Sequence, residues 1–273
     1  MSDIVLSAGV RSNLLQLQQT SDLITQTQNR LATGKKVNSA LDNAINFFTA
    51  QGLDTRANNL NSLLDSMSNG INTIQAANNG ITSITKLVQS AQALVSQAQQ
   101  ANNTTTQAAL STQFNSLLAQ IGQLAGDSGF NGVNLLAGNT LTVTMNETAT
   151  STVSVTGVNC TNANNSPLSI ANAASNWAGA SDITAASTAL SAALTSLQSE
   201  SQTLSSSLST VQIRQDFTKA MVNTLQSGSA NLTLADSNAE GANLLALQTR
   251  QQLSSTALSL AAQADQNVLR LFR

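Results

Sequence analysis

Few side chains in this sequence could do chemistry, and none of them stands in a catalytic pattern. The chain of 273 residues contains no histidine, so neither a Ser-His-Asp nor a Cys-His catalytic arrangement can form. The carboxylates Asp42, Asp54 and Asp65 stand apart, and isolated carboxylates of this kind are typical of helix caps and solvated faces rather than of an acid/base pair. The sequence therefore predicts a protein that is not an enzyme, with no metal and no cofactor.

The single cysteine, Cys160, can form neither an internal disulfide nor a cysteine metal site. It lies in an Asn-rich stretch over residues 157–177, which we interpret as a loop with one short helix. We expect this loop to be exposed on the surface, and Cys160 to be an exposed, passive thiol. Since reactive groups define no site, the function has to depend on how the backbone elements pack.

The composition indicates a chain that is soluble through neutral polar groups. Charged residues make up 9% of it, against about a quarter of an average soluble chain. The formal net charge of −2 offers no basic patch for nucleic acid. No apolar run approaches the roughly 20 residues that span a bilayer, and the first residues lack the features of a cleaved secretory signal. We predict no binding to nucleic acid and no membrane span.

Most of the chain carries apolar residues at the spacing of amphipathic helices. The stripe over residues 53–98 predicts a helix on the order of 70 Å long, and the stripe over residues 110–124 predicts a helix that folds back antiparallel on it. Residues 183–232 predict a second rod of roughly the same length as the first. The expected rod-core residues are Leu60, Leu64, Ile74, Ile81, Leu117, Ile121, Leu197, Leu204, Leu208 and Val222.

Several residues predict how these helices begin, end or are approached. Gly34 can end the first helix, and Ser39 with Asp42 three residues later predicts the N-cap and first turn of the next one. Gly70 and Gly80 lie inside the first rod, where glycine is unfavourable, so we expect local bends or close helix contacts there. Only residues 140–156 change to a period of two, with many β-branched residues, which predicts a β-hairpin.

The helical stripes near the two ends of the chain cannot be buried by either helix alone. We predict a mainly α fold: an elongated antiparallel bundle of long rods, with the β-hairpin at one tip and the N- and C-terminal helices paired as a coiled coil. We also expect these stripes to pack against other copies of the chain. The packing residues are Leu14, Leu17, Ile24, Leu31, Leu253, Leu260, Val268 and Leu271.

Three short motifs are specific. They are RLATGKKVNSALDNA at residues 30–44, FNGVNLL at 130–136 and QNVLRLFR at 266–273. They are similar to the RLxSGxxINSAxDDAA, FNGxxLL and QNVLxLLR patterns of bacterial flagellin, the subunit of the flagellar filament. Large flagellins insert outer domains between the hairpin and the second rod, so this chain resembles a minimal flagellin that lacks them.

The resemblance implies a structural subunit that self-assembles into the helical filament for swimming motility. It further implies unfolded export through the flagellar type III channel to an extracellular location. The implied partners are other copies of the chain, an export chaperone, the filament cap and the hook-junction proteins. In these terms the chain divides into two inner-tube helices and the parts of a rod domain. The segments are residues 1–38 (N-terminal helix), 39–135 (first half of the rod), 136–180 (hairpin and variable loop), 181–232 (second half of the rod) and 233–273 (C-terminal helix).

Two other functions remain open from the residues. A hook-filament junction protein of the flagellum has similar ends, although the three-part match favours flagellin. A helical signalling bundle, such as the cytoplasmic rod of a chemoreceptor, also has long repeats rich in Ala, Ser and Gln. That second alternative would require transmembrane spans and a helical tip, whereas this sequence predicts a β-hairpin.

Overall fold

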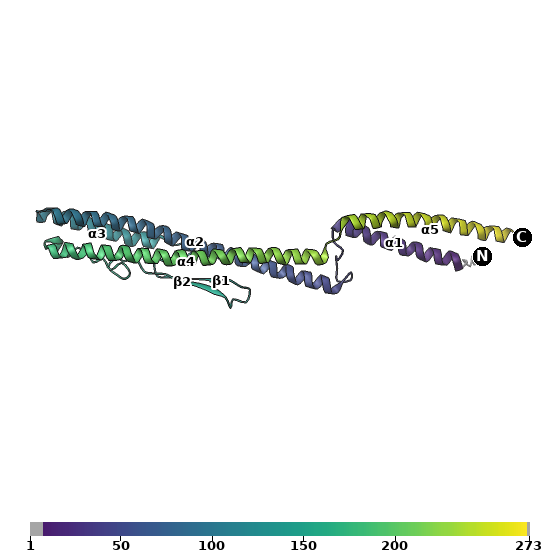
Figure 1. Cartoon of the computed structure of the whole chain (residues 1–273), viewed down its shortest axis with the longest axis horizontal. Helices are drawn as coiled ribbons and strands as arrows, with labels where there is room; N and C mark the ends of the chain where they lie inside the picture. Colours follow the sequence, from purple (N-terminus) through teal and green to yellow (C-terminus); the bar gives the residue numbers. More distant parts are fainter. Residues whose placement is uncertain (1–7, 272–273) are drawn as a thin grey trace. The chain divides into compact units, whose positions relative to one another are not determined.

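The structure is a computed structural model that describes residues 8–271, without the side chains of residue 265 and residues 268–271. It is mainly α-helical and contains a small antiparallel sheet (Figure 1). The predicted fold class, long helices with a β-hairpin, is confirmed. The elements are α1 (Ala8–Thr33), α2 (Ala44–Gln100), α3 (Thr104–Asp127), β1 (Thr140–Thr144), β2 (Thr152–Thr156), the 3-10 helix η1 (Ala174–Trp177), α4 (Ala180–Thr233) and α5 (Ser237–Leu271).

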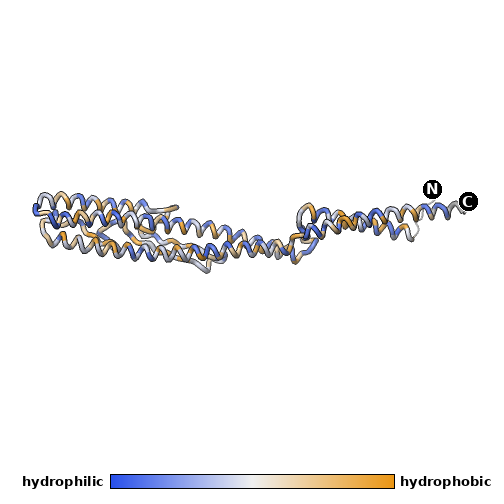
Figure 2. The backbone as a smooth tube through the Cα atoms, turned by 45° about the horizontal axis from the view of Figure 1, so that its top comes forward, coloured by the Kyte–Doolittle hydropathy of each residue, from blue (hydrophilic) through white to orange (hydrophobic). Residues whose placement is uncertain are grey.

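The chain forms two compact units, which we call the central unit and the terminal unit. The central unit is Arg56–Asn223, and the terminal unit comprises the residues up to Thr55 together with those from Thr224 onward. Apolar and polar residues alternate along the helices of both units (Figure 2). Among the helices that the structure describes, none combines the length and the hydropathy that a bilayer span requires.

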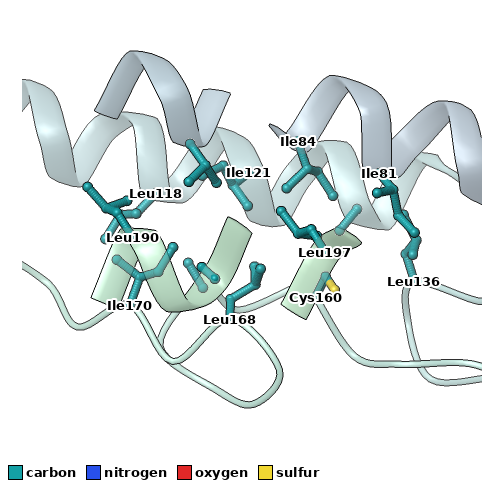
Figure 3. Packing of buried hydrophobic residues seen from close by; sticks show 14 of the residues in the cluster. Ile81, Ile84, Leu118, Ile121, Leu136, Cys160, Leu168, Ile170, Leu190 and Leu197 are labelled. Carbon is teal, nitrogen blue, oxygen red and sulfur yellow. The ribbon is translucent and has the colours of Figure 1, made fainter. Parts of the chain in front are cut away.

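The core of the central unit lies where α2, α3 and α4 meet. Ile84 of α2, Ile121 of α3 and Leu190 of α4 are fully buried in it and belong to one apolar cluster, in which Ile84 lies near Leu197 and Leu190 lies near Leu118 (Figure 3). The helix α3 folds back on α2, as the sequence predicts. It begins at a cap in which the Asn103 side chain accepts a hydrogen bond from the Thr105 amide at 2.8 Å.

The FNGVNLL motif ends α3 and anchors the chain that follows. Asn131 and Gly132 adopt left-handed backbone conformations, with φ of 48° and 80°, which turn the chain sharply. The side-chain amide of Asn134 then donates hydrogen bonds of 2.8 Å to the carbonyl oxygens of Ala125 and Gly126 at the helix end, and the Ala125 oxygen also accepts one of 3.3 Å from the Ser128 backbone N–H. The next two residues, Leu135 and Leu136, are buried in the core. The motif is therefore a helix cap followed by an anchor.

The two strands form the predicted hairpin, in which Thr140 pairs with Thr156 and Thr144 with Thr152. The predicted position of the hairpin at one tip is wrong, because it lies along the side of α2 (Figure 1). Its turn is held by an ion pair of 2.9 Å between Arg56 Nε and Glu147 Oε2. The physical reason is that α3, with 24 residues, first carries the chain back by about 36 Å before the strands begin.

The two rod glycines make close contacts without breaking α2. A Cβ built on Gly70 would lie 2.6 Å from Cγ2 of Val143, and one built on Gly80 would lie 2.7 Å from Cδ1 of Leu136. Close contacts were expected at both sites, but the approaching groups belong to the hairpin and the α3–β1 loop rather than to another helix.

The stretch after the hairpin exposes most of its polar residues, as predicted, but its apolar side chains are buried, which corrects the prediction of an exposed Cys160. Cys160, Leu168 and Ile170 point into the core (Figure 3), and Trp177 of η1 packs against Phe114 of α3 with ring centroids 4.9 Å apart and the ring planes tilted by 52°. These apolar side chains lie far apart in an otherwise polar segment, so no periodic pattern reveals them. Cys160 is therefore a buried thiol, and burial, reinforced by the negative charge of Glu200, raises its pKa to about 11.

The joint between α1 and α2 belongs to the terminal unit. The helix α1 ends at Thr33 and is followed by Gly34 with φ of +67°, as predicted. Asp42 does not lie in the first turn of α2, which corrects the predicted capping pair. Its carboxylate accepts hydrogen bonds of 3.0 Å from the backbone amides of Asn38 and Ser39, and Asn43 caps α2 by accepting one of 2.9 Å from the Asn46 amide.

Candidate subunit-packing surface

Helices α1 and α5 pack against each other side by side (Figure 1). They are antiparallel. Arg30 lies beside Glu240 near the joint, and Leu23, which precedes Arg30 by seven residues, lines the same groove as Leu247, which follows Glu240 by seven residues. The Arg30 Nη1 atom and the Glu240 Oε1 atom form an ion pair at 3.2 Å, and the Glu240 side chain is almost entirely buried. The expected pairing of the two end helices is therefore present within one chain.

On α1, the predicted stripe mainly faces α5. Val10 and Ile24 are buried, Leu17 and Leu31 are half-buried, and Leu14 is slightly more exposed. Threonines at positions 20 and 27 are buried among them. The hydroxyl of Thr20 donates a hydrogen bond of 2.8 Å to the Gln16 carbonyl. A polar residue can therefore lie in the contact between α1 and α5, which we call the seam, with little loss of stability.

On α5, the predicted stripe faces the other way. The half-buried apolar residues are Leu244, Leu247 and Leu258. At about 100° per residue, Leu253 and Leu260 project from nearly the opposite side of the helix. Leu245, Leu253 and Leu260 are 68%, 67% and 62% exposed, respectively, and we call them the outer face of α5.

The remaining predicted residues have these positions. The side chains of Val268 and Leu271 lie outside the part of the chain that the structure describes. The predicted rod-core residues are all withdrawn from solvent to some degree. Leu60, Ile74, Ile81, Ile121, Leu197, Leu204 and Val222 are buried, while Leu64, Leu117 and Leu208 are half-buried against the core of the central unit.

Sequence reasoning missed two groups of exposed apolar side chains. Leu41, at 98% exposure, lies with Ile45 and Phe48 at the joint before and within the first turns of α2. Ile213 and Phe217 are four residues apart on α4 and are also exposed. Both groups lie outside the regular apolar stripes of their helices. Large apolar residues at such positions are the sequence signal that could have revealed them. Large exposed apolar groups mark surfaces that bind a partner.

The paired helices with an apolar outer face define a structural protein that associates through helix packing. Residues 8–140 match the family model described as the bacterial flagellin N-terminal helical region. Flagellin FljK of Caulobacter vibrioides is 34% identical over 282 residues, covering 100% of this chain and 99% of that protein. Flagellin FljN of the same organism is 35% identical over 275 residues, again covering 100% and 99%. A flagellin of Brucella melitensis is 29% identical over 286 residues, covering 100% of both chains.

This chain belongs to the bacterial flagellin family. It is a structural subunit of the flagellar filament, an extracellular appendage, and it forms a homopolymer rather than acting as an enzyme. These matches favour flagellin over the junction protein and the signalling bundle that the residues left open.

Proposed function

We propose that the outer face of α5 joins each subunit to neighbouring copies in the filament, while the opposite face of the same helix holds α1. The observation that carries this proposal is the two-thirds exposure of Leu245, Leu253 and Leu260 beside a separate, half-buried seam. Complete burial of a leucine side chain is worth about 1.5–3 kcal/mol. Three such residues repeated along a polymer give a substantial driving force for assembly.

In the assembled filament, the α1–α5 pairs form the inner tube and the rod helices surround it. The five segments from residues 1–38 to 233–273 follow this division. The proposed packing set also includes Leu14, Leu17, Ile24 and Leu31 of α1, together with Val268 and Leu271 of α5. Family membership supports this arrangement, and so does the antiparallel pairing of α1 with α5.

The chain is exported unfolded through the flagellar type III channel, with a chaperone before export and the filament cap and hook-junction proteins at the growing structure. Family membership supports this route. The single cysteine also supports it, because an internal disulfide would have to be reduced before the chain could be threaded. Deletion of the channel should retain the protein inside the cell, and its appearance in the medium of such a strain would contradict this route.

The packing role of α5 can be tested by seeded polymerisation of the purified chain, followed by light scattering and electron microscopy. Leu260→Asp should lower elongation by about tenfold or more, because it places an unpaired charge in an apolar contact. Ser255→Asp is a matched control, since this exposed position projects about 140° away from Leu260 on the same helix. A chain that ends before Ser254 should not polymerise.

Equal elongation of Leu260→Asp and the unchanged chain would refute the packing role of the outer face. Loss of elongation in Ser255→Asp as well would mean that any added charge on α5 blocks assembly. Circular dichroism of each variant shows whether the helices are retained.

A further inference from the structure

Leu23 of α1 separates two grooves on the surface of the terminal unit. The side chain is 45% exposed. On one side lies a groove of about 540 Å³ between α1 and the joint, with Asp22 and Asp42 in its lining. On the other side lies a groove of about 350 Å³ between α1 and α5, with Leu247 and Arg250 in its lining. We call them the acidic groove and the basic groove.

The formal charges of the two grooves are opposite. The acidic groove is lined by Asp22, Asp42 and Arg30, which sum to −1, and the basic groove by Arg30, Glu240 and Arg250, which sum to +1. Arg30 borders both grooves and is already paired with Glu240. When the Arg30–Glu240 pair is set aside, the remaining charges are the carboxylates of Asp22 and Asp42 in the acidic groove and the guanidinium of Arg250 in the basic groove.

Asp22 and Arg250 are the free members of this set. The carboxylate of Asp42 already accepts the amides of Asn38 and Ser39, which hold its pKa below the usual value and keep it negative. Among the residues that the structure describes, the side chains of Asp22 and Arg250 have no ion-pair or hydrogen-bond partner.

We propose that Arg250 of one copy enters the acidic groove of a neighbouring copy and pairs there with Asp22. This inference rests on the proposed packing role of the terminal helices and adds the ion pair that orients the contact. Arg250 is three residues from both Leu247, on the side of α5 that faces α1, and Leu253, on the outer face, so it projects from the border between these two sides. The charge complementarity of the two grooves thus continues the apolar surface proposed to join the copies.

Because the two grooves are different surfaces, the contact joins unlike patches of identical subunits. Such a contact does not close on itself as a twofold dimer does, and it can continue from subunit to subunit. A second copy of the chain is therefore a suitable occupant. The exposed Leu23 side chain between the two grooves would be covered in the same contact. Its burial excludes water from the ion pair, so solvent screens the attraction less.

The test uses charge reversal in the full chain. Asp22→Lys and Arg250→Glu should each lower the elongation rate in seeded polymerisation by about tenfold or more, because like charges then face each other across the contact. The double variant Asp22→Lys/Arg250→Glu should recover to within about threefold of the unchanged chain. An equimolar mixture of the two single variants should recover as well, because alternating copies again present opposite charges.

Asp65→Lys is the matched control, since it makes the same charge change at an exposed position of α2 in the central unit. It should elongate normally. The inference is overturned if either single variant elongates like the unchanged chain, if Asp65→Lys loses elongation too, or if neither the double variant nor the mixture recovers. Circular dichroism identifies any variant that has not folded. If a charge-reversal variant has not folded, the neutral variants Asp22→Asn and Arg250→Gln are measured instead. Each of them should slow elongation at low salt only, because salt screens the ion pair.

The failure of this inference can be told apart from the failure of the proposed function. Normal assembly of Leu260→Asp would refute the packing role of the outer face, whatever the charge variants do. Loss of assembly in Leu260→Asp together with normal assembly of Asp22→Lys would refute only the ion pair.

Discussion

Val143 of β1 lies so close to Gly70 of α2 that a Cβ at position 70 would be 2.6 Å from the Val143 Cγ2 atom. The hairpin thus packs against α2 at a point where the helix has no side chain, and only glycine leaves room for Val143 there. Val143 itself is buried, and the Arg56–Glu147 ion pair holds the turn of the same hairpin farther along α2. Two separate contacts therefore fix the hairpin to the side of the rod helix.

Gly70→Ala is expected to lower the free energy of unfolding by about 1–2 kcal/mol, although alanine favours a helix over glycine by about 1 kcal/mol. The new methyl group displaces Val143, and Gly70→Ala combined with Val143→Ala should recover part of the loss. Gly52→Ala, in the same helix with no atom near its Cβ position, should instead stabilise the protein. Denaturant unfolding measures all three variants and the unchanged chain, and a stabilising Gly70→Ala would show that the hairpin does not pack tightly against α2.

Asn134→Ala should destabilise the central unit by about 1–3 kcal/mol, because it removes three hydrogen bonds and leaves the Gly126 carbonyl oxygen and the Leu136 backbone amide without the Asn134 side chain, while the Ala125 carbonyl oxygen keeps only the Ser128 N–H. Asn134→Asp keeps the oxygen that accepts from Leu136 but loses the donor to α3. Its unfolding midpoint should therefore fall between those of the unchanged chain and Asn134→Ala. Equal midpoints for Asn134→Ala and the unchanged chain would contradict the capping role.

The helices and the hairpin could be predicted because their periods are local properties of the sequence. The position of the hairpin could not, since it depends on how far α3 carries the chain back and on the fit of Val143 to Gly70. Burial of Cys160 and Trp177 was missed for a similar reason. Their partners, such as Phe114, lie far away in the chain, and the polar residues between them conceal the contact.

The surface of α5 shows a different limit. This helix carries apolar residues on two sides, with Leu244, Leu247 and Leu258 on one and Leu253 and Leu260 on the other. Periodicity identifies both sets as apolar, but it contains no information about which of them meets α1 inside the subunit. The exposure of each side chain in the folded chain is the observation that separates the seam from the outer face.

Arg30→Ala should loosen the pairing of α1 with α5, because it leaves the nearly buried Glu240 carboxylate without its ion-pair partner. The expected cost is about 1–2 kcal/mol, below that of a fully buried pair since Arg30 is partly exposed. Hydrogen exchange should then accelerate in α1 and α5 and stay unchanged in α3. Glu240→Gln removes the charge but retains an oxygen that can accept from Arg30, so it should have a smaller effect. Unaltered exchange in α1 for Arg30→Ala would show that the apolar seam alone holds the pair.

Cys160 should make the stability of the central unit fall in alkaline solution. Burial raises the pKa of the thiol from 9.0 to about 11, so between these values the folded chain keeps a proton that the unfolded chain releases. The unfolded state binds fewer protons there, and the free energy of unfolding therefore decreases as the pH rises from 9 toward 11. The contribution is fully present below pH 9 and amounts to about 2–3 kcal/mol. Cys160→Ala should remove this part of the pH dependence. The same burial predicts that the Cys160 thiol reacts with iodoacetamide only as fast as the central unit opens. Rapid labelling of the folded chain at pH 8 would contradict both this slow reaction and the expected loss of stability in alkaline solution.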